Sequence, residues 1–174
     1  MTLTNVLNEW VTCDLLDNNP DCQVCSPNME GKRFFSYGGQ SNFGGEIVTV
    51  KCFEDNSRVK ELLATHGKKD GNAKVLVVDG GGSMRCALLG DMIAQSAVDN
   101  GWAGVIIYGC VRDVDDMANM PLGVQALGSI PRKSKRQGVG DIDVALHFGG
   151  MTIRSGMFVY ADNNGIIVSG KALI

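Results

Sequence analysis

Two short stretches of the sequence contain the residues best suited to chemistry. Gly90 to Ile93 open an expected helix, and Arg112 to Asp116 follow an expected strand. A helix N-terminus presents free N–H groups and the positive end of the helix dipole, which suit a small anion. The guanidinium of Arg112 can hold a carboxylate through two parallel hydrogen bonds. Together the two stretches predict a site for a small carboxylate.

Three aspartates in these stretches would repel that anion unless a cation lay between them. Asp91, Asp113 and Asp116 all fall close to the expected site. A hard divalent metal held by carboxylate oxygens and water removes the conflict. A metal, a guanidinium and a helix N-terminus would together bind a 2-oxo acid and stabilise its enolate. We therefore predict a metal-assisted site for a small carboxylate.

The elements that must position these residues form a βαβ unit. Residues 75–78 and 105–108 are continuous apolar runs rich in β-branched side chains, which is typical of strands covered on both faces of a parallel sheet. Between them, Asp91 stands at an expected N-cap and Asn100-Gly101 at an expected C-cap. Ligands of open α/β sheets sit beyond the carboxyl ends of the strands, so we expect both chemical stretches to meet there.

The rest of the chain indicates an α/β fold with a strand-rich C-terminal part. No repeat or linker divides the sequence, so we expect one domain over residues 1–174. The remaining elements that the hydrophobic pattern predicts are helices over residues 3–16, 58–65 and 117–120, an extended piece over 33–37, and strands over 44–53, 122–130, 144–148, 151–154, 157–160 and 166–168.

Composition narrows the class of protein. A net charge of −3 and a pI near 5.3 argue against direct binding of nucleic acid, which needs a basic face. No apolar run approaches the roughly 20 residues of a membrane span, and the N-terminus lacks the pattern of a secretory signal. Six cysteines without a disulfide-type arrangement suit a reducing compartment. We expect a cytoplasmic protein that does not contact membranes.

Three further motifs each allow two interpretations. Cys22 and Cys25 have the spacing of half a zinc site or a redox pair, but no second pair follows, which favours two incidental thiols. The basic cluster over residues 132–136 could contact an acidic partner or substrate, although a solvated loop is the favoured interpretation. The glycine turn over residues 79–83 lacks the ending of a phosphate loop, so we expect a tight turn that helps to shape the pocket floor.

The combined motifs resemble a known family. Val78 to Ser83, Gly90-Asp91 and Arg112-Asp113-x-x-Asp116 are similar to motifs of the 4-hydroxy-4-methyl-2-oxoglutarate aldolase / regulator of ribonuclease activity A (RraA-like) family. Asp91 precedes Arg112 by 21 positions (112 − 91), which is the spacing in that family. Further similar segments lie at residues 44–55, 149–152 and 160–165. The resemblance implies a layered, swivelling β/β/α-type domain that assembles as a homotrimer.

The resemblance also implies an activity and roles for individual residues. It implies a class II aldolase that cleaves 4-hydroxy-4-methyl-2-oxoglutarate to pyruvate with Mg²⁺ or Mn²⁺, and that decarboxylates oxaloacetate through the same enolate. Asp113 would bind the metal directly, and Asp91 and Asp116 would bind it through water. Arg112 and Asp91 would be catalytic. The implied substrate-binding groups are Arg112 and the backbone amides of Gly90, Asp91, Met92 and Ile93.

The same family contains non-catalytic regulators that bind and inhibit ribonuclease E. Regulators typically lack one or both key carboxylates, whereas Asp91 and Asp113 are both present here, which favours catalysis. The sequences of residues 51–56 and 160–165 nevertheless resemble those of the regulator branch. Longer aldolases carry a C-terminal extension with an acidic residue that reaches the neighbouring subunit, and this sequence has no acid after Asp162. Aldolase activity is therefore the expectation, with binding of ribonuclease E as the alternative.

Overall fold

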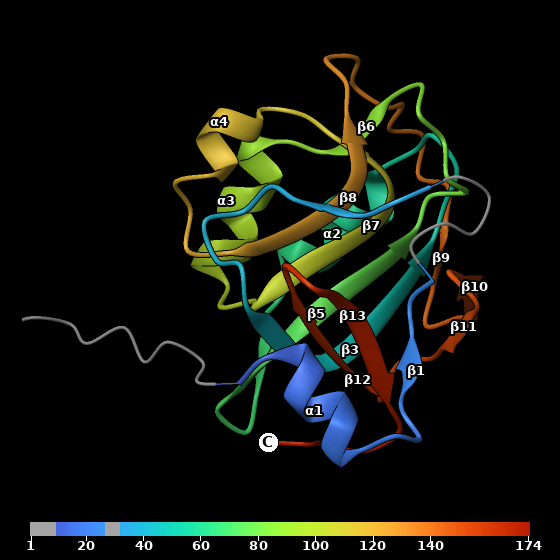
Figure 1. Cartoon of the computed structure of the whole chain (residues 1–174). Helices are drawn as coiled ribbons and strands as arrows, with labels where there is room; N and C mark the ends of the chain where they lie inside the picture. Colours follow the sequence, from blue (N-terminus) through green and yellow to red (C-terminus); the bar gives the residue numbers. More distant parts are fainter. Residues whose placement is uncertain (1–9, 27–31) are drawn as a thin grey trace, which may run out of the picture.

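A computed structural model describes residues 10–26 and 32–174, and it shows a mixed α/β fold in which strands dominate (Figure 1). The helices are α1 (Thr12–Asn18), α2 (Ser57–Leu63), α3 (Asp91–Asp99) and α4 (Val114–Met117). The strands are β1 (Gln23–Val24), β2 (Phe35–Ser36), β3 (Phe43–Lys51), β4 (Lys68–Lys69), β5 (Asn72–Asp79), β6 (Ala87–Leu89), β7 (Gly104–Val111), β8 (Gly123–Ser129), β9 (Asp141–Ile142), β10 (Leu146–Phe148), β11 (Met151–Ile153), β12 (Phe158–Asp162) and β13 (Gly165–Ser169).

Four neighbouring parallel strands, β3, β5, β7 and β8, form the centre of the main sheet. Side chains alternate across a strand, so Val75 and Val77 join the hydrophobic core on one face of β5, while Leu76 and Val78 join the core on the other. A strand buried on both faces must be apolar at every position, and this explains the continuous apolar runs. The predicted parallel pairing across the βαβ unit is confirmed.

The C-terminal part adds antiparallel strands to the same sheet. β12 pairs with β3 and β13 pairs with β12, so the order of the main path is β1-β13-β12-β3-β5-β7-β8-β2. β10 and β11 form a separate antiparallel hairpin. The predicted strand-rich C-terminal part is therefore confirmed, whereas the swivelling β/β/α layering stays a prediction.

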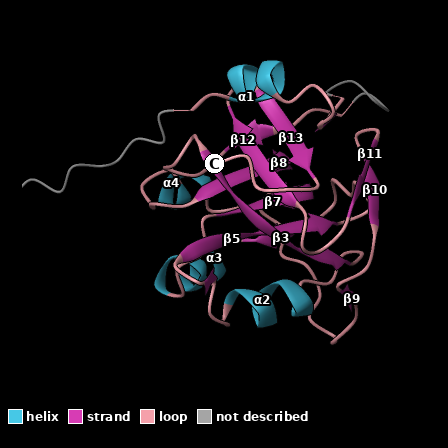
Figure 2. Ribbon diagram, turned by 90° about the horizontal axis from the view of Figure 1, so that it is seen from below, coloured by secondary structure: helices cyan, strands magenta, loops and turns pink. Residues whose placement is uncertain are grey.

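Helices α2 and α3 lie together on one face of the sheet, and α1 lies beside β12 and β13 (Figure 2). α3 turns Ile93, Ala94 and Ala97 toward the core. The two helices are tied by a hydrogen bond from the Ser96 hydroxyl to the Leu63 carbonyl oxygen at 3.3 Å. This packing holds the N-terminus of α3 at the carboxyl end of the parallel strands.

Three elements differ from the expectations by more than a few residues at their ends or were not expected. α1 runs from Thr12 to Asn18, and the expected helical residues 3–9 lie outside the described part of the chain. α4 begins at Val114 and includes Asp116, because Asp113 adopts the left-handed conformation (φ 54°) immediately before it and two acids in its first turn suit the helix dipole. Residues 87–89, which were not among the expected strands, form β6 parallel to β7. In the described residues, no helix combines the length and apolar character needed to cross a membrane.

Candidate active site

The two chemical stretches are brought together at the carboxyl ends of two paired strands. β6 ends at Leu89, and Gly90 leads directly into α3. β7 ends at Val111, and Arg112 and Asp113 follow it. The backbone N–H of Arg112 donates to the Leu89 carbonyl oxygen at 2.9 Å, which fixes one stretch against the other. The predicted meeting of the helix opening with Arg112 and Asp113 is therefore observed.

The opening of α3 is capped by Asp113, and the expected N-cap role of Asp91 is wrong. Gly90 occupies the N-cap position with an extended backbone, and Asp91 is the first helical residue. The Asp91 N–H donates to Asp113 Oδ2 at 3.0 Å, and the Met92 N–H donates to Asp91 Oδ1 at 2.8 Å. A carboxylate from the neighbouring strand end thus performs the capping that the sequence assigned to a local residue. The helix opening already binds carboxylate oxygens.

Gly90 leaves room for the side chains of Asp113 and Arg112. A Cβ atom at this position would lie 2.6 Å from Asp113 Oδ2 and 3.3 Å from Arg112 Nε. Its φ of −133° is open to any residue, so the constraint comes from contact and not from backbone strain. Only glycine lets the carboxylate and the guanidinium approach the helix opening this closely.

Arg112 is half-buried, Asp113 is exposed, and the two residues lie beside each other. Arg112 Nε is 3.7 Å from Asp113 Oδ2, and the side chains are 39% and 34% exposed. The Arg112 Nη1 atom also donates to the Pro131 carbonyl oxygen at 3.5 Å. The left-handed backbone of Asp113 is one that aspartate tolerates better than most residues. The local backbone therefore places a carboxylate and a guanidinium side by side at the opening of α3.

An open pocket of about 660 Å³ lies over this junction. Five of the predicted site residues and the predicted metal ligand line it, namely Gly90, Asp91, Met92, Ile93, Arg112 and Asp113. The pocket therefore collects the substrate-binding groups that the sequence predicts.

Two expected contributors do not line this pocket. Asp116 lies exposed in α4, so a water-mediated role for it stays a prediction. The glycine turn over residues 79–83 was expected to shape the pocket floor, but none of its residues lines this pocket, whereas Ala87 and Leu89 of β6 do. The turn itself has the expected positive φ angles, 67° at Gly81 and 68° at Gly82.

The opposite wall of the pocket comes from residues that the sequence did not assign to the site. Lys133, Ser134, Lys135 and Arg136 line it together with Asn56. β8 lies next to β7 in the parallel sheet, so the loop after β8 reaches the same edge of the sheet. The order of the strands was the missing information, because it cannot be read from the basic cluster alone.

The available donors fit a metal that keeps much of its water. In the described residues there is no cluster of three or more histidine, cysteine, aspartate or glutamate side chains able to hold a metal. The pocket offers two carboxylates, those of Asp91 and Asp113. Mg²⁺ typically binds proteins through one or two carboxylates and completes its shell with water and substrate oxygens. The donor set therefore suits Mg²⁺ or Mn²⁺ and does not suit an all-protein cage.

The remaining motifs have structural explanations. Burial raises the pKa of the Cys25 thiol to about 11, so this cysteine carries little thiolate at neutral pH, which supports the interpretation of Cys22 and Cys25 as incidental thiols. Arg85 forms an ion pair with Glu54 at 2.6 Å, and neither residue lines the pocket. Neither feature adds a group to the site.

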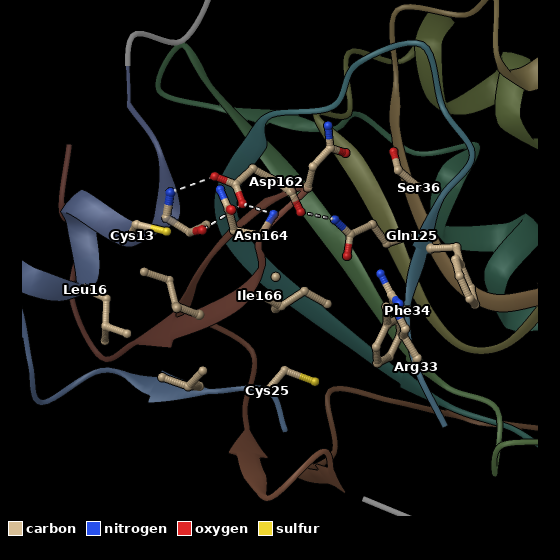
Figure 3. Close-up of a pocket in the computed structure, with 16 residues that line it drawn as sticks. Cys13, Leu16, Cys25, Arg33, Phe34, Ser36, Gln125, Asp162, Asn164 and Ile166 are labelled. Atoms are coloured by element: carbon tan, nitrogen blue, oxygen red, sulfur yellow. Dashed lines mark hydrogen bonds between the residues drawn. The ribbon is translucent and has the colours of Figure 1, made fainter. Parts of the chain in front are cut away.

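A second pocket, of about 730 Å³, lies between α1, β2 and β13 (Figure 3). Its buried acid, Asp162, accepts hydrogen bonds from the Thr12 N–H and hydroxyl, both at 2.7 Å, and from the Asn164 N–H at 2.8 Å. Gln125 Nε2 donates to the Asp162 carbonyl oxygen at 2.9 Å. These hydrogen bonds join α1 and β8 to the end of β12.

Comparison with known proteins assigns the family. The RraA-like family, described as Aldolase/RraA, matches residues 12–168. A protein of Acinetobacter baylyi named "Putative 4-hydroxy-4-methyl-2-oxoglutarate aldolase" is 62% identical over 167 residues, which are 95% of this chain and 96% of the relative.

Two solved structures share the fold. One, described as the RNA-processing inhibitor RraA of Thermus thermophilis, is 38% identical with a TM-score of 0.86 and covers 94% of each chain. The other, described as an S-adenosylmethionine:2-dimethylmenaquinone methyltransferase of Geobacillus kaustophilus, is 47% identical with a TM-score of 0.85, over 94% of this chain and 97% of that one. The names of these relatives differ, but the matches span nearly the whole sequence and agree with the motifs around Asp91 and Arg112: the chain belongs to the RraA-like (Aldolase/RraA) family.

Proposed function

We propose that the protein is a divalent-metal-dependent aldolase that cleaves 4-hydroxy-4-methyl-2-oxoglutarate to pyruvate, and that it decarboxylates oxaloacetate through the same enolate. The observation that carries the proposal is the junction of Arg112, Asp113 and the opening of α3 in one pocket. The names of close relatives support the aldolase part of the proposal.

The helix opening and Arg112 would hold the 2-oxo acid. Because the Asp91 N–H now donates to Asp113 Oδ2, a substrate carboxylate would compete with that side chain for the same donor. Arg112 adds a fixed positive charge beside it, where negative charge develops on the keto oxygen as the carbon–carbon bond breaks. Binding and stabilisation of the enolate would thus come from groups that are already in position.

Asp113 would hold the metal directly, and Asp91 and Asp116 would do so through water. When bound, Mg²⁺ or Mn²⁺ would supply Lewis-acid polarisation of the keto group. Asp91, at the first position of α3, would orient the water that takes up the proton of the substrate's 4-hydroxyl group during the aldol cleavage. The chain's own task is to keep two carboxylates and one guanidinium within reach of the same small molecule.

Release of pyruvate tests the proposal directly. Pyruvate should appear from 4-hydroxy-4-methyl-2-oxoglutarate and from oxaloacetate in the presence of Mg²⁺ or Mn²⁺, and a chelator should stop both reactions. Restoring the metal after chelation should restore the rate. Failure of both substrates with either metal would sink the proposal.

A regulator of ribonuclease E is the second candidate, favoured by the likeness to the Thermus RraA structure. We expect a homotrimer in either case, which sedimentation of the purified protein checks. Inhibition of ribonuclease E by a preparation that releases no pyruvate would support the regulator. Inhibition together with turnover would mean that one fold serves both roles.

A further inference from the structure

The second pocket, between α1, β2 and β13, lies where the main sheet curls back on itself. Gln125 Nε2 on β8 donates to the Asp162 carbonyl oxygen on β12 at 2.9 Å, although β3, β5 and β7 separate these strands in the order of the sheet. The two ends of that order meet at the pocket, because residues of β1 and β13 and residues of β2 and β8 all line it. The resulting space of about 730 Å³ falls in the range of pockets for small organic molecules.

One buried polar side chain of this pocket has an unused acceptor. Gln125 is 3% exposed, and the atom that faces the Asp162 carbonyl oxygen must be its amide nitrogen, because a carbonyl oxygen only accepts. Within the described residues no group donates to Gln125 Oε1, and no fully enclosed side-chain oxygen is left without a donor, so Oε1 opens into the pocket. Figure 3 shows this oxygen pointing away from Asp162. An acceptor placed in this way favours a ligand with an O–H or N–H group.

The same pocket contains a guanidinium without a carboxylate partner. Arg33 lines the pocket and forms no ion pair among the described residues. Its Cζ atom lies 5.2 Å from the centre of the Phe35 ring, so the cation rests against an aromatic face. The acid of the pocket, Asp162, is bonded to Thr12 and Asn164 instead. A guanidinium suits the carboxylate of a ligand, which would supply the missing negative charge.

Apolar side chains make up much of the remaining lining and favour an aromatic ligand. Leu16, Val24 and Ile166 line the pocket together with Phe34 and Phe35. Val24 and Phe35 are exposed, so contact with an apolar body would remove their surface from water. A flat aromatic ring suits this lining because pairs of rings gain more than their contact area alone provides.

We propose that this pocket binds an aromatic carboxylic acid that carries a hydroxyl group. The ring would lie against Phe34, the hydroxyl group would donate to Gln125 Oε1, and the carboxylate would bind Arg33. The inference goes beyond the proposed function, because no residue that lines this pocket also lines the pocket over the opening of α3.

Three probes with one carbon skeleton test the site. 4-Hydroxycinnamate carries both polar groups, cinnamate lacks the hydroxyl group, and methyl 4-hydroxycinnamate lacks the charge. Isothermal titration of the whole protein should show one saturable site per chain for 4-hydroxycinnamate. Cinnamate should bind about fivefold more weakly, since a neutral hydrogen bond contributes roughly that factor, and the methyl ester about tenfold more weakly, since a hydrogen bond between charged groups contributes more.

The variant R33Q should bind 4-hydroxycinnamate and its methyl ester equally well. R154Q is the matched control, because it removes the same charge from an exposed arginine that follows β11 and lines neither pocket. R112Q alters the pocket over α3 instead. Both R154Q and R112Q should keep the preference of about tenfold for the free acid.

The variant Q125M tests the contact with the hydroxyl group. Methionine keeps a long unbranched side chain but offers no amide oxygen, so Q125M should bind cinnamate as the wild type does and should lose the preference for 4-hydroxycinnamate. The change also removes the hydrogen bond to Asp162, and a thermal melt checks that the variant is folded. R33Q, at an exposed side chain, tests the site independently of that bond.

Four results would overturn the site. They are the absence of saturable binding by the wild type, equal binding of 4-hydroxycinnamate and cinnamate by the wild type, an unchanged preference for the free acid in R33Q, and loss of that preference in R154Q or R112Q. The last result would mean that net charge, or the pocket over α3, sets the affinity. None of these measurements depends on the release of pyruvate, so the site and the proposed function are tested separately.

Discussion

Two acids, Asp113 and Asp162, lie in pockets of similar size and do different work. Asp162 is 3% exposed and accepts three hydrogen bonds from Thr12 and Asn164, so its oxygens are committed to protein donors (Figure 3). Asp113 is an exposed residue whose side chain is 34% exposed, and it accepts one N–H through Oδ2; within the described residues no hydrogen bond reaches its Oδ1. The carboxylate with spare acceptor capacity is the one placed to bind something else.

The pockets also differ in how the chain builds them. The Asp162 pocket is closed by α1, which reaches across 150 residues of sequence to join Thr12 to Asp162. The Asp113 pocket lies at the carboxyl ends of parallel strands, where chain segments end and backbone groups remain for ligands. The second carboxylate of this pocket belongs to Asp91, the first residue of α3. The comparison predicts that Asp162 maintains stability and that Asp113 maintains activity.

The largest expected effect is a loss of activity without a loss of stability when Asp113 is replaced. Asp113→Asn keeps the side-chain shape and a residue that tolerates positive φ, but removes the charge that would hold the metal. Loss of groups that only support a metal ligand costs about 10- to 100-fold, so pyruvate release should fall by at least about 100-fold. The thermal midpoint should change little.

Asp162→Asn should lower stability and leave activity unchanged. It places an amide against donors that need an acceptor in a buried site, which costs about 3 kcal/mol of the free energy of unfolding. Denaturant unfolding measures that loss, and turnover per folded molecule should be unaffected. Equal loss of turnover in both variants would break the comparison.

A second way to sharpen the comparison is to crowd the junction without altering its charged groups. Gly90→Ala places a methyl group 2.6 Å from Asp113 Oδ2, so the carboxylate must move. Misplacement of a catalytic group by about 1 Å can cost roughly 100-fold, and we expect a 10- to 100-fold loss of kcat with little change in the thermal midpoint. A methyl group added at Gly156 meets no atom within 4 Å, so Gly156→Ala supplies a control for the space lost, although not for its positive φ of 89°.

Sequence reasoning succeeded where local pattern determined the structure. The apolar runs of β5 and β7 predicted buried parallel strands, and the spacing of the polar residues placed Arg112 and Asp113 beside the opening of α3. These features depend on neighbouring residues in the sequence and on the rule that parallel strands share one carboxyl edge.

It failed where contacts join distant segments. The cap of α3 comes from Asp113, 22 residues after the residue it caps, so the local choice of Asp91 was wrong. The basic loop entered the site only because β8 lies beside β7 and because Lys135 bridges to Asp55, 80 positions earlier (135 − 55). A single sequence gives no measure of such pairings, so it offered a substrate contact for the basic cluster only as the less favoured interpretation.

A smaller effect should follow from removing one donor to Asp162. Thr12→Val removes the hydroxyl that donates to Oδ1 at 2.7 Å and keeps the volume of the side chain. A buried carboxylate left short of one charge-assisted hydrogen bond costs about 2 kcal/mol. Chemical denaturation should report this loss while pyruvate release stays at the wild-type rate. A change in rate would show that α1 also supports the active site.

The smallest expected effect is on how the free energy of unfolding changes with pH in acid. Burial by itself would raise the pKa of the Asp162 carboxyl, but hydrogen bonds from Thr12 and Asn164 outweigh it and hold that pKa below its usual range. Because the unfolded chain then binds the proton more readily, at an ordinary pKa of about 3.9, this group stabilises the fold above that pH and loses its contribution as pH falls through the lower folded value. Asp162→Asn cannot lose a contribution in this way, so its deficit against the wild type should be full near pH 6 and should shrink as pH falls from about 4 toward 2. Unfolding free energies measured at several pH values test this, and parallel curves for the two proteins would mean that Asp162 is protonated equally in the folded and unfolded chain.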